Sequence, residues 1–448
     1  MRSKLRPLVA PAYLLLCIIL GGSVQGVWAN FALQLIGLAI LVWVAERREN
    51  LAPHDRLPLL LILLALLVVA LQLIPLPPEI WTRFPGRSGI ARGYDLLAIL
   101  RPWLSISELP YEAVSTTFAL LPPLAIFALG ATDNSRGMAG ALLIGTALAI
   151  VVGALQVASG PTSAWYFYPI TNTGAVAFFA NGNHMATLLL AAIPFVPALL
   201  LSGKSQQRLR GKSAATITIA IAALGLILIG IALNRSLAAL LLVVPVLLAT
   251  GLMIPVGWRL RWVGVPLVVL GLAGAVAALS SNPLNSTSAS SAKEFSLQSR
   301  QHIWRTTAAA IAETFPVGTG LGSFQQVYRL QENPDRVDAT YVNHAHNDYL
   351  ELALELGLPG ILLILVFFGW WGRRLAQIWS SNLSSPFDRA ATIASAAILA
   401  HSVVDYPLRT SAMAAVFAMC IGILARFRPA ERASARSDST GPRHVTIG

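Results

Sequence analysis

The sequence predicts an all-α membrane protein, a polytopic bundle of about twelve transmembrane helices with one large loop on the outer side. Of its 448 residues, 56% are hydrophobic and only 12% are charged, whereas a soluble domain carries about 25% charged residues. Apolar runs of about 17–25 residues, long enough to cross a bilayer, recur along the whole chain. No period-two alternation of polar and apolar residues indicates a transmembrane barrel, so a helical bundle is expected.

Hydropathy assigns twelve helical segments. They are residues 8–22, 27–45, 57–75, 113–130, 137–158, 184–201, 214–233, 236–254, 262–280, 357–379, 389–404 and 409–425. Residues 1–280 therefore hold helices one to nine with short loops, 281–356 form the large loop with amphipathic helices, and 357–427 hold helices ten to twelve. Residues 428–448 are polar and are expected to be a disordered tail. The basic N-terminus and the apolar run after it resemble a signal peptide, but without a clear cleavage site we interpret them as an uncleaved first helix.

The distribution of charge predicts that both termini face the cytoplasm. In that orientation 21 of the 32 Lys and Arg residues lie inside, and the net charge is +14 inside and −2 outside. An excess of positive charge inside is the expected bias of membrane proteins. The basic composition thus reflects topology, and no patch of interleaved aromatic and basic residues indicates a nucleic-acid partner. Cys17 and Cys420 both lie in predicted helices, so no disulfide framework is expected.

Three outer loops differ in composition. Residues 76–112 contain Pro, Trp and four arginines and are expected to lie along the membrane interface, and residues 159–183 are rich in aromatic residues typical of the headgroup level. The third loop, 281–356, opens with a Ser-rich linker, followed by an amphipathic helix over Arg300–Thr314 and a glycine-rich turn. Those glycines resemble a phosphate-binding loop only in composition, because no Walker lysine accompanies them.

The most informative stretch is residues 343–360, NHAHNDYLELALELGLPG, at the outer mouth of the tenth helix. His346 is a candidate catalytic base, since histidine titrates near neutral pH and can accept a proton during group transfer. Asn347 follows it, and after nine further residues comes Gly357-x-x-Gly360. The two glycines require no chemistry, because small residues let helices pack closely.

The start of this helix is acidic. Asp348, Glu351 and Glu355 share one helical face, which could hold a basic partner or a sugar hydroxyl. For the two glutamates a solvated acidic face is the simpler interpretation. His344 and His346, with Asp348, also have a spacing that permits a metal site, but such spacing is common by chance and no Cys or second His cluster completes it. No metal is therefore expected.

Three arginines are candidates for binding an anion. Arg235 lies between the seventh and eighth helices, where a guanidinium is costly unless it faces a cavity or partner, and snorkelling to the surface is the alternative. Arg300 and Arg305 lie in the large loop, and the planar guanidinium suits phosphate oxygens. Pairing with Glu313 or with the carboxylates after His346 is the alternative for both, and the simpler one for Arg305.

Two more histidines, His184 and His401, lie at helix ends. Each is more simply a structural histidine with satisfied hydrogen bonds than a catalyst. Asn181 and Asn183 beside His184 are nevertheless suited to hydrogen-bond a glycan.

Over nearly its full length the chain resembles the O-antigen ligase and polymerase family of bacterial membrane proteins. The resemblance rests on the number of helices, the large outer loop and the His346-Asn347 pair followed by Gly357-x-x-Gly360. The Arg300-x-x-x-Trp304 pattern and the Asn-Arg-Ser at 234–236 are also similar to family positions.

This resemblance implies a metal-independent glycosyltransferase without a cofactor, with a GT-C-like helical fold in the bacterial inner membrane. The donor would be a glycan on undecaprenyl diphosphate, and transfer would occur on the periplasmic face. The acceptor would be a sugar hydroxyl, either on lipid A–core, as in O-antigen ligases, or on a lipid-linked glycan, as in O-antigen and exopolysaccharide polymerases. Some relatives attach glycans to proteins, so that acceptor also stays open.

Carried over residue by residue, His346 would be the general base, and Arg235 and Arg300 would bind the diphosphate. Supporting positions would be Arg305, His344, Asn347 and Asp348. Elementary chemistry agrees, because a departing diphosphate needs positive charge and a hydroxyl nucleophile needs a base that titrates near the working pH. A single displacement would invert the anomeric carbon.

Two other classes of function compete with a transferase. A transporter or flippase of lipid-linked glycans would place ionisable residues or broken helices near the bilayer midplane, whereas the charges here concentrate at the outer edge. A receptor role for the large loop would not require a His-Asn pair beside membrane-edge arginines.

Overall fold

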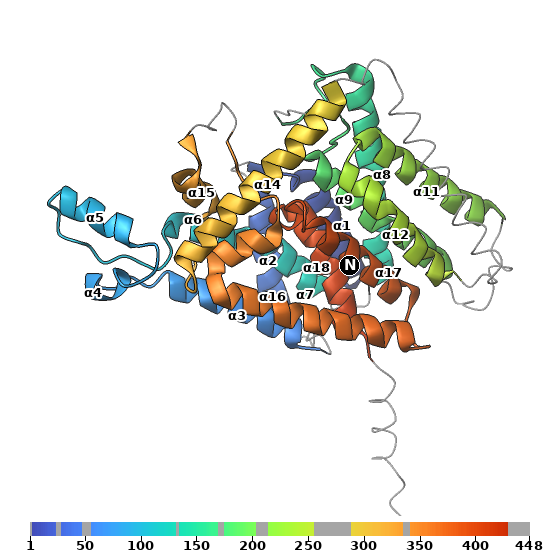
Figure 1. The fold of residues 1–448 in the computed structure, drawn as a ribbon. Helices are drawn as coiled ribbons and strands as arrows, with labels where there is room; N and C mark the ends of the chain where they lie inside the picture. The colour runs from blue at the N-terminus through green and yellow to red at the C-terminus, as the bar shows by residue number, and fades with distance from the viewer. Residues whose placement is uncertain are drawn as a thin grey trace, which may run out of the picture.

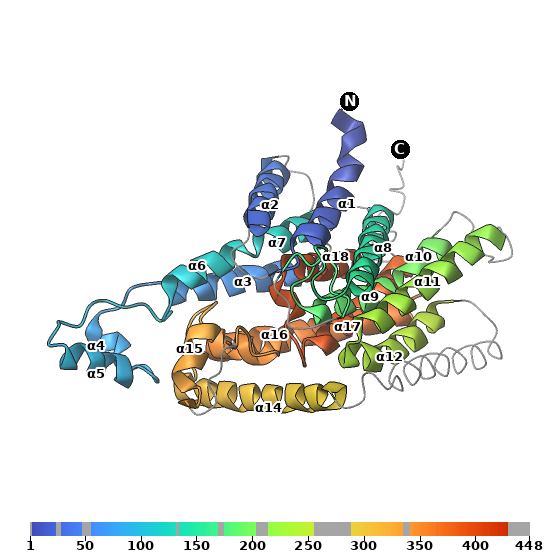
Figure 2. The same cartoon turned by 90° about the horizontal axis from the view of Figure 1, so that it is seen from above.

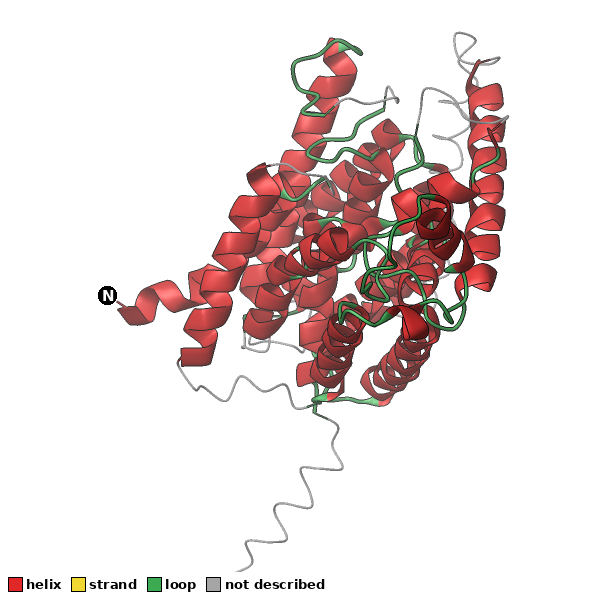
Figure 3. Ribbon diagram, turned by 90° about the vertical axis from the view of Figure 1, so that its left-hand side faces the viewer, coloured by secondary structure: helices red, strands yellow, loops and turns green. Residues whose placement is uncertain are grey.

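The computed structural model describes residues 2–23, 28–46, 55–130, 134–168, 174–202, 214–254, 288–334 and 341–428. Within these ranges the chain is helical and contains no strand (Figure 3), apart from one isolated bridge between Leu76 and Leu104. The predicted all-helical class is therefore confirmed. The ninth predicted segment, 262–280, and residues 429–448 of the predicted tail lie outside the described residues.

The helices of the bundle follow the apolar runs of the sequence. In chain order they are α1 (Arg2–Leu20), α2 (Trp28–Glu46), α3 (Leu57–Gln72), α6 (Pro110–Phe118), α7 (Leu121–Gly130), α8 (Ser135–Ser159), α9 (Gly182–Ala192), α10 (Phe195–Leu201), α11 (Ala214–Asn234), α12 (Leu237–Met253), α16 (Asp348–Ser380), α17 (Pro386–His401) and α18 (Ser411–Arg426). Eleven of the twelve predicted segments overlap one of these helices.

Six spans in the described part of the chain are long and apolar enough to cross a membrane. They are α2, α6 with α7, α8, α9 with α10, α11 and α16. Four further apolar helices are shorter, over Pro7–Leu20, Leu57–Gln72, Leu237–Met253 and Ser411–Arg426. The centre of the bundle is the most deeply buried. In the span formed by α9 and α10, 83% of the apolar stretch is buried inside the protein, and nearly every residue of α18 is buried.

The remaining helices gather at the end of the bundle where α16 begins. Helix α14 (Ser288–Thr314, yellow in Figure 1) packs against α16 and is drawn below it in Figure 2, and the short α15 (Phe324–Gln331) packs next to both. Two short helices, α4 (Pro78–Trp81) and α5 (Ser88–Leu96), form an arm that projects from this end (Figures 1 and 2). That the segment 76–112 lies along a membrane interface stays a prediction.

Helix α16 contains a break that positions its first turns. The side chain of Asn347 caps the helix by accepting from the amides of Tyr349 and Leu350, both at 3.0 Å. At Gly357 the backbone adopts φ 62° and ψ −144°, which kinks the helix. Such a positive φ favours glycine, so Gly357 has a conformational role beyond the close packing that the sequence suggested.

The glycine-rich segment after α14 fills this kink. The amides of Thr319 and Gly320 donate to the carbonyls of Leu354 and Glu355, at 3.0 and 2.9 Å. The amide of Gly322 donates to the Glu355 carboxylate at 2.8 Å. Because these amides bind protein acceptors, the segment is a packing element for α16, and its resemblance to a phosphate-binding loop ends at composition.

Replacing Gly357 with alanine is expected to destabilise the start of α16. An added Cβ would lie 2.7 Å from the amide nitrogen of Gly318, and the positive φ disfavours alanine, so we expect a loss of about 2 kcal/mol or more in the free energy of unfolding. Gly369 on the same helix has no atom within 4 Å of an added Cβ, so Gly369→Ala is the matched control and should be neutral or slightly stabilising. Equilibrium unfolding in mixed micelles measures both, and equal stabilities would refute the conformational role.

Candidate active site

The candidate site is built around the carboxylate of Asp405, in the loop between α17 and α18. Asp405 is fully buried. Its Oδ1 accepts hydrogen bonds from the Nδ2 of Asn181 at 3.0 Å and from the amide of Tyr406 at 2.8 Å, and its Oδ2 accepts one from the Nδ2 of Asn183. The two asparagines stand at the start of α9, so the loop is tied to a helix more than 200 residues earlier.

Three cationic or titratable side chains also face this carboxylate. The NH2 group of Arg300 lies 3.4 Å from Oδ2, the Nε2 of His184 lies 3.5 Å from Oδ1, and the Nδ1 of His346 lies 3.6 Å from Oδ1. His184 is buried, whereas about a fifth to a quarter of the Arg300 and His346 side chains stays exposed. The predicted base and one predicted phosphate ligand therefore meet at one buried anion while both remain accessible.

The pKa of Asp405 follows from these neighbours. Burial acts to raise the pKa of the carboxyl, but the interactions with His184 and His346 outweigh burial and hold it well below its usual range. Asp405 is therefore ionised at neutral pH. A carboxylate facing Nδ1 of His346 favours the proton on Nδ1, which leaves Nε2 as the basic nitrogen toward the accessible side.

Tyr406 forms the aromatic centre of the cluster. Its ring lies 4.2 Å from that of His344, 4.9 Å from that of His184 and 5.0 Å from that of His346, measured between centroids. Its hydroxyl accepts a hydrogen bond from Asn343 at 3.3 Å. Burial raises the pKa of Tyr406, so the phenol stays neutral and supports the imidazole rings by packing.

The backbone of His346 is held in an uncommon conformation. Its φ is 49°, in the left-handed region that non-glycine residues rarely adopt. The indole of Trp304 donates to the carbonyl of His346 at 3.4 Å. The amide of Ala345 donates to Glu351 at 2.9 Å, and Asn347 donates to the carbonyl of Val403 at 2.9 Å. Bonds on both sides of His346 therefore fix the direction of its side chain.

The acidic face of α16 is not solvated, which corrects the simpler interpretation of its two glutamates. Asp348, Glu351 and Glu355 are all buried, and Arg409 lies among them. The Arg409 guanidinium is 2.8 Å from Glu355, 3.5 Å from Glu351 and 3.8 Å from Asp348. Burial acts to lower the pKa of Arg409, but the surrounding carboxylates outweigh it and raise that pKa. The sequence suggested either a basic partner or a sugar hydroxyl for this face, and the structure shows a basic partner, Arg409.

His344 belongs to this second network. Its Nδ1 lies 2.7 Å from the Oε1 of Glu351, while His346 faces Asp405 and Asp348 accepts from the hydroxyl of Ser402. His344, His346 and Asp348, the three residues of the possible metal site, thus each contact a different partner. No group of three His, Cys, Asp or Glu side chains in the described part of the chain is arranged to hold a metal ion.

Arg235 lies beside the cluster without joining it. It occupies the turn between α11 and α12 with φ 62°, is exposed, and forms no ion pair with any described residue. Its neighbours tie the turn to α9, because Asn234 donates to the carbonyl of Gly182 at 2.8 Å and Ser236 donates to the side chain of Asn183 at 2.7 Å. Asn183 in turn binds Asp405, so Arg235 is connected to the carboxylate through only two intervening side chains.

The remaining candidate residues either lie outside the Asp405 cluster or bind its carboxylate as structural partners. Arg305 is exposed on α14 and forms no ion pair with a described residue, and Glu313, its expected partner, instead accepts from Gln331 at 2.7 Å. The Nδ1 of His401 contacts the hydroxyl of Thr187 at 2.7 Å inside the protein, which fits a structural histidine. Asn181 and Asn183, suggested as glycan ligands, bind Asp405 through their amide groups.

Sequence reasoning missed Asp405, Tyr406 and Arg409. The predicted helices 389–404 and 409–425 leave Asp405–Leu408 as a short turn, with Arg409 at the start of the second helix. The available signal was an acid and an arginine within five residues, in a connection between two apolar helices.

Comparison with known proteins adds an independent observation. Residues 221–365 match the family model described as O-antigen ligase. This match supports assignment of the chain to the O-antigen ligase/polymerase family. The matched stretch contains Arg235, Arg300 and His346, while Asp405 and Arg409 lie beyond it. No curated protein matches the chain.

Replacing Asp405 with asparagine is expected to destabilise the protein in a pH-dependent way. Loss of a buried charge that has several partners costs about 3 kcal/mol in the free energy of unfolding at pH 7. The carboxyl has a folded pKa below its unfolded value, so its contribution is present above about pH 4 and is lost as pH falls through the folded pKa. The difference between wild type and variant should therefore stay constant from pH 7 to about pH 5 and shrink below about pH 4.

The control for this experiment is Asp95→Asn. Asp95 pairs with Arg101 at 2.7 Å on the exposed arm, where an ion pair contributes little. Unfolding in mixed micelles between pH 3 and pH 8 measures both variants. A stability of Asp405→Asn equal to that of wild type at pH 7 would rule out the carboxylate as the organising group.

Proposed function

We propose that this chain is a membrane glycosyltransferase that moves a glycan from undecaprenyl diphosphate to a sugar hydroxyl on the periplasmic face. The observation that carries the proposal is the meeting of His346 and Arg300 at the buried Asp405 carboxylate. It unites a base and a cation at a partly exposed site, which are the two groups that such a transfer requires. The proposed topology is about twelve spans with both termini in the cytoplasm and the segment 281–356 outside.

In the proposed reaction Nε2 of His346 removes the proton from the acceptor hydroxyl as its oxygen attacks the anomeric carbon. The bond between that carbon and the diphosphate oxygen breaks, and the diphosphate leaves with the polyprenyl chain. Asp405 stabilises the imidazolium that forms, in the manner of an orienting carboxylate. Arg300 and the exposed Arg235 offset the charge that develops on the leaving group. One displacement inverts the anomeric configuration, and the reaction requires no cofactor.

The competing transporter function receives less support from the arrangement of the described residues. Asp405 lies in the connection between α17 and α18, Arg409 ends the short 3-10 helix Pro407–Arg409 in that connection, and His346 precedes the first turn of α16. These three residues therefore lie at the ends of apolar helices and not within them. Helix α16 is broken at Gly357, and this break is closed by contact with residues 316–318. Ligases and polymerases share all these groups, and the nature of the acceptor decides between them.

His346→Ala is expected to abolish transfer, because a positioned general base contributes about 100-fold or more to the rate. A deletion strain complemented with the variant is examined on gels for surface lipopolysaccharide and secreted polysaccharide, after membrane expression has been checked. Long chains that stay unattached to core would identify a ligase, and single repeat units a polymerase. His302→Ala, two residues after Arg300 in α14, is the histidine control. Full activity of His346→Ala would exclude the general-base role and favour the transporter.

Arg300→Lys is expected to reduce transfer by at least about tenfold, because lysine keeps the charge but loses the planar fork that binds diphosphate oxygens and the carboxylate together. Arg305→Lys, five residues along the same helix and exposed, should stay within about twofold of wild type. Initial rates with a lipid-linked glycan donor in proteoliposomes measure the two variants side by side. Similar losses in both would argue against a specific role for Arg300.

A further inference from the structure

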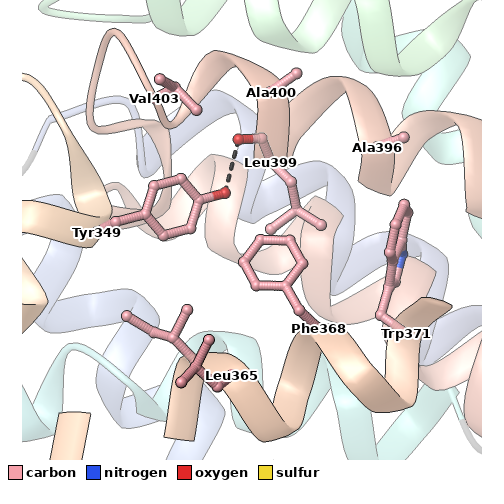
Figure 4. A pocket seen from close by; sticks show the side chains of 9 residues that line it. Tyr349, Leu365, Phe368, Trp371, Ala396, Leu399, Ala400 and Val403 are labelled. Atoms are coloured by element: carbon pink, nitrogen blue, oxygen red, sulfur yellow. Dashed lines mark hydrogen bonds between the residues drawn. The ribbon is translucent and has the colours of Figure 1, made fainter. Parts of the chain in front are cut away.

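An apolar cavity opens between α16 and α17 (Figure 4). Its volume is about 450 Å³. Side chains of α16, of α17 and of the turn that follows α17 form its walls, among them Tyr349, Leu365, Phe368, Trp371, Leu399 and Val403. All of these present carbon to the cavity except for the hydroxyl of Tyr349 and the indole nitrogen of Trp371.

Those two polar groups already have partners that close the cavity at its two ends. The Tyr349 hydroxyl donates to the carbonyl of Leu399 at 2.7 Å, and the Trp371 indole donates to the hydroxyl of Ser395 at 3.0 Å. Between these bonds the side remains open, since 61% of Leu365 and 46% of Val403 are exposed. The cavity therefore suits a flexible apolar chain that enters sideways and makes no hydrogen bond.

The Tyr349 end of the cavity adjoins the candidate site. Asn347, the residue after His346, donates to the carbonyl of Val403 at 2.9 Å and accepts from the amide of Tyr349 at 3.0 Å. It thus binds both walls. Val403 also stands two residues before Asp405. An apolar chain in this cavity would have its head group beside His346.

We propose that this cavity binds the first isoprene units of the polyprenyl diphosphate donor, an inference that rests on the proposed function. In such a donor the bond that breaks joins the sugar to a diphosphate, and only that diphosphate separates it from the isoprenoid chain. The chain must therefore begin within a diphosphate's length of His346 and Arg300. The acceptor hydroxyl has no such constraint, since sugars separate it from any lipid anchor.

The cavity is long enough for only the first part of the polyprenyl group. One wall runs from Ala396 on α17 to Val403, just beyond the end of that helix, which is about two helical turns or about 10 Å. This length accommodates the isoprene units nearest the diphosphate and leaves the rest of the chain in the bilayer. Binding would thus select for an isoprenoid next to a diphosphate and would tolerate different total chain lengths.

Photo-crosslinking in nanodiscs tests the location. Benzoylphenylalanine replaces either Leu365, which lines the cavity, or Val366, its neighbour, which is 47% exposed but lines no part of it. The full chain is placed in phosphatidylethanolamine and phosphatidylglycerol with undecaprenyl diphosphate. We expect polyprenyl adducts at position 365 to exceed those at 366 by about tenfold. Phospholipid adducts alone at 365, or equal polyprenyl adducts at both positions, would mean that ordinary lipid covers the cavity.

Filling the cavity gives a second readout. Ala400 is an exposed cavity residue on α17, and Ala400→Trp should weaken the binding of undecaprenyl diphosphate by about tenfold without lowering the melting temperature. Val366→Trp is the matched control and should bind as wild type does. If wild type binds undecaprenyl diphosphate and Ala400→Trp binds it equally well, the cavity inference fails and the proposed function stands. If wild type does not bind it at all, both fail.

Discussion

The buried carboxylate of Asp405 is the constraint on which the rest of the site depends. An isolated carboxylate in a protein interior costs several kcal/mol, so it persists only where hydrogen bonds and positive charge surround it. Its partners come from distant parts of the chain: Asn181 and Asn183 at α9, Arg300 on α14, and His346 before α16. The hydrogen bonds and ion pairs of this one carboxylate therefore hold three segments together, and the packing of the helical bundle determines where they meet.

A second charged network shares the same loop. Arg409, four residues after Asp405, neutralises the carboxylates that begin α16. Glu351 also binds the side chain of His344 and the amide of Ala345, so this network positions the backbone immediately before His346. The loop between α17 and α18 thus positions the candidate base twice, once through its side chain and once through its backbone. A shift of this loop would disturb both networks together.

The sequence was a better guide to the helices than to the site. A long apolar segment in a bilayer must satisfy its own backbone, so hydropathy alone located eleven of the twelve expected helices. His346 and Arg300 could be selected by residue type and position. The burial of Glu351 and Glu355 could not be foreseen, because helical periodicity places them on one face without revealing that Arg409, more than fifty residues later, covers it. Tertiary contacts of that kind leave no local pattern.

The charges of the site suit the proposed transfer at each stage. Arg300 and ionised Asp405 offset one another before the reaction begins. In the proposed reaction, His346 would gain the acceptor's proton, and a positive charge, at the moment the departing diphosphate gains a negative charge. The new cation is held by a carboxylate already in place, so little reorganisation is needed. Exposed Arg235 lies nearby without a described ionic partner, and its charge stays available to the leaving diphosphate.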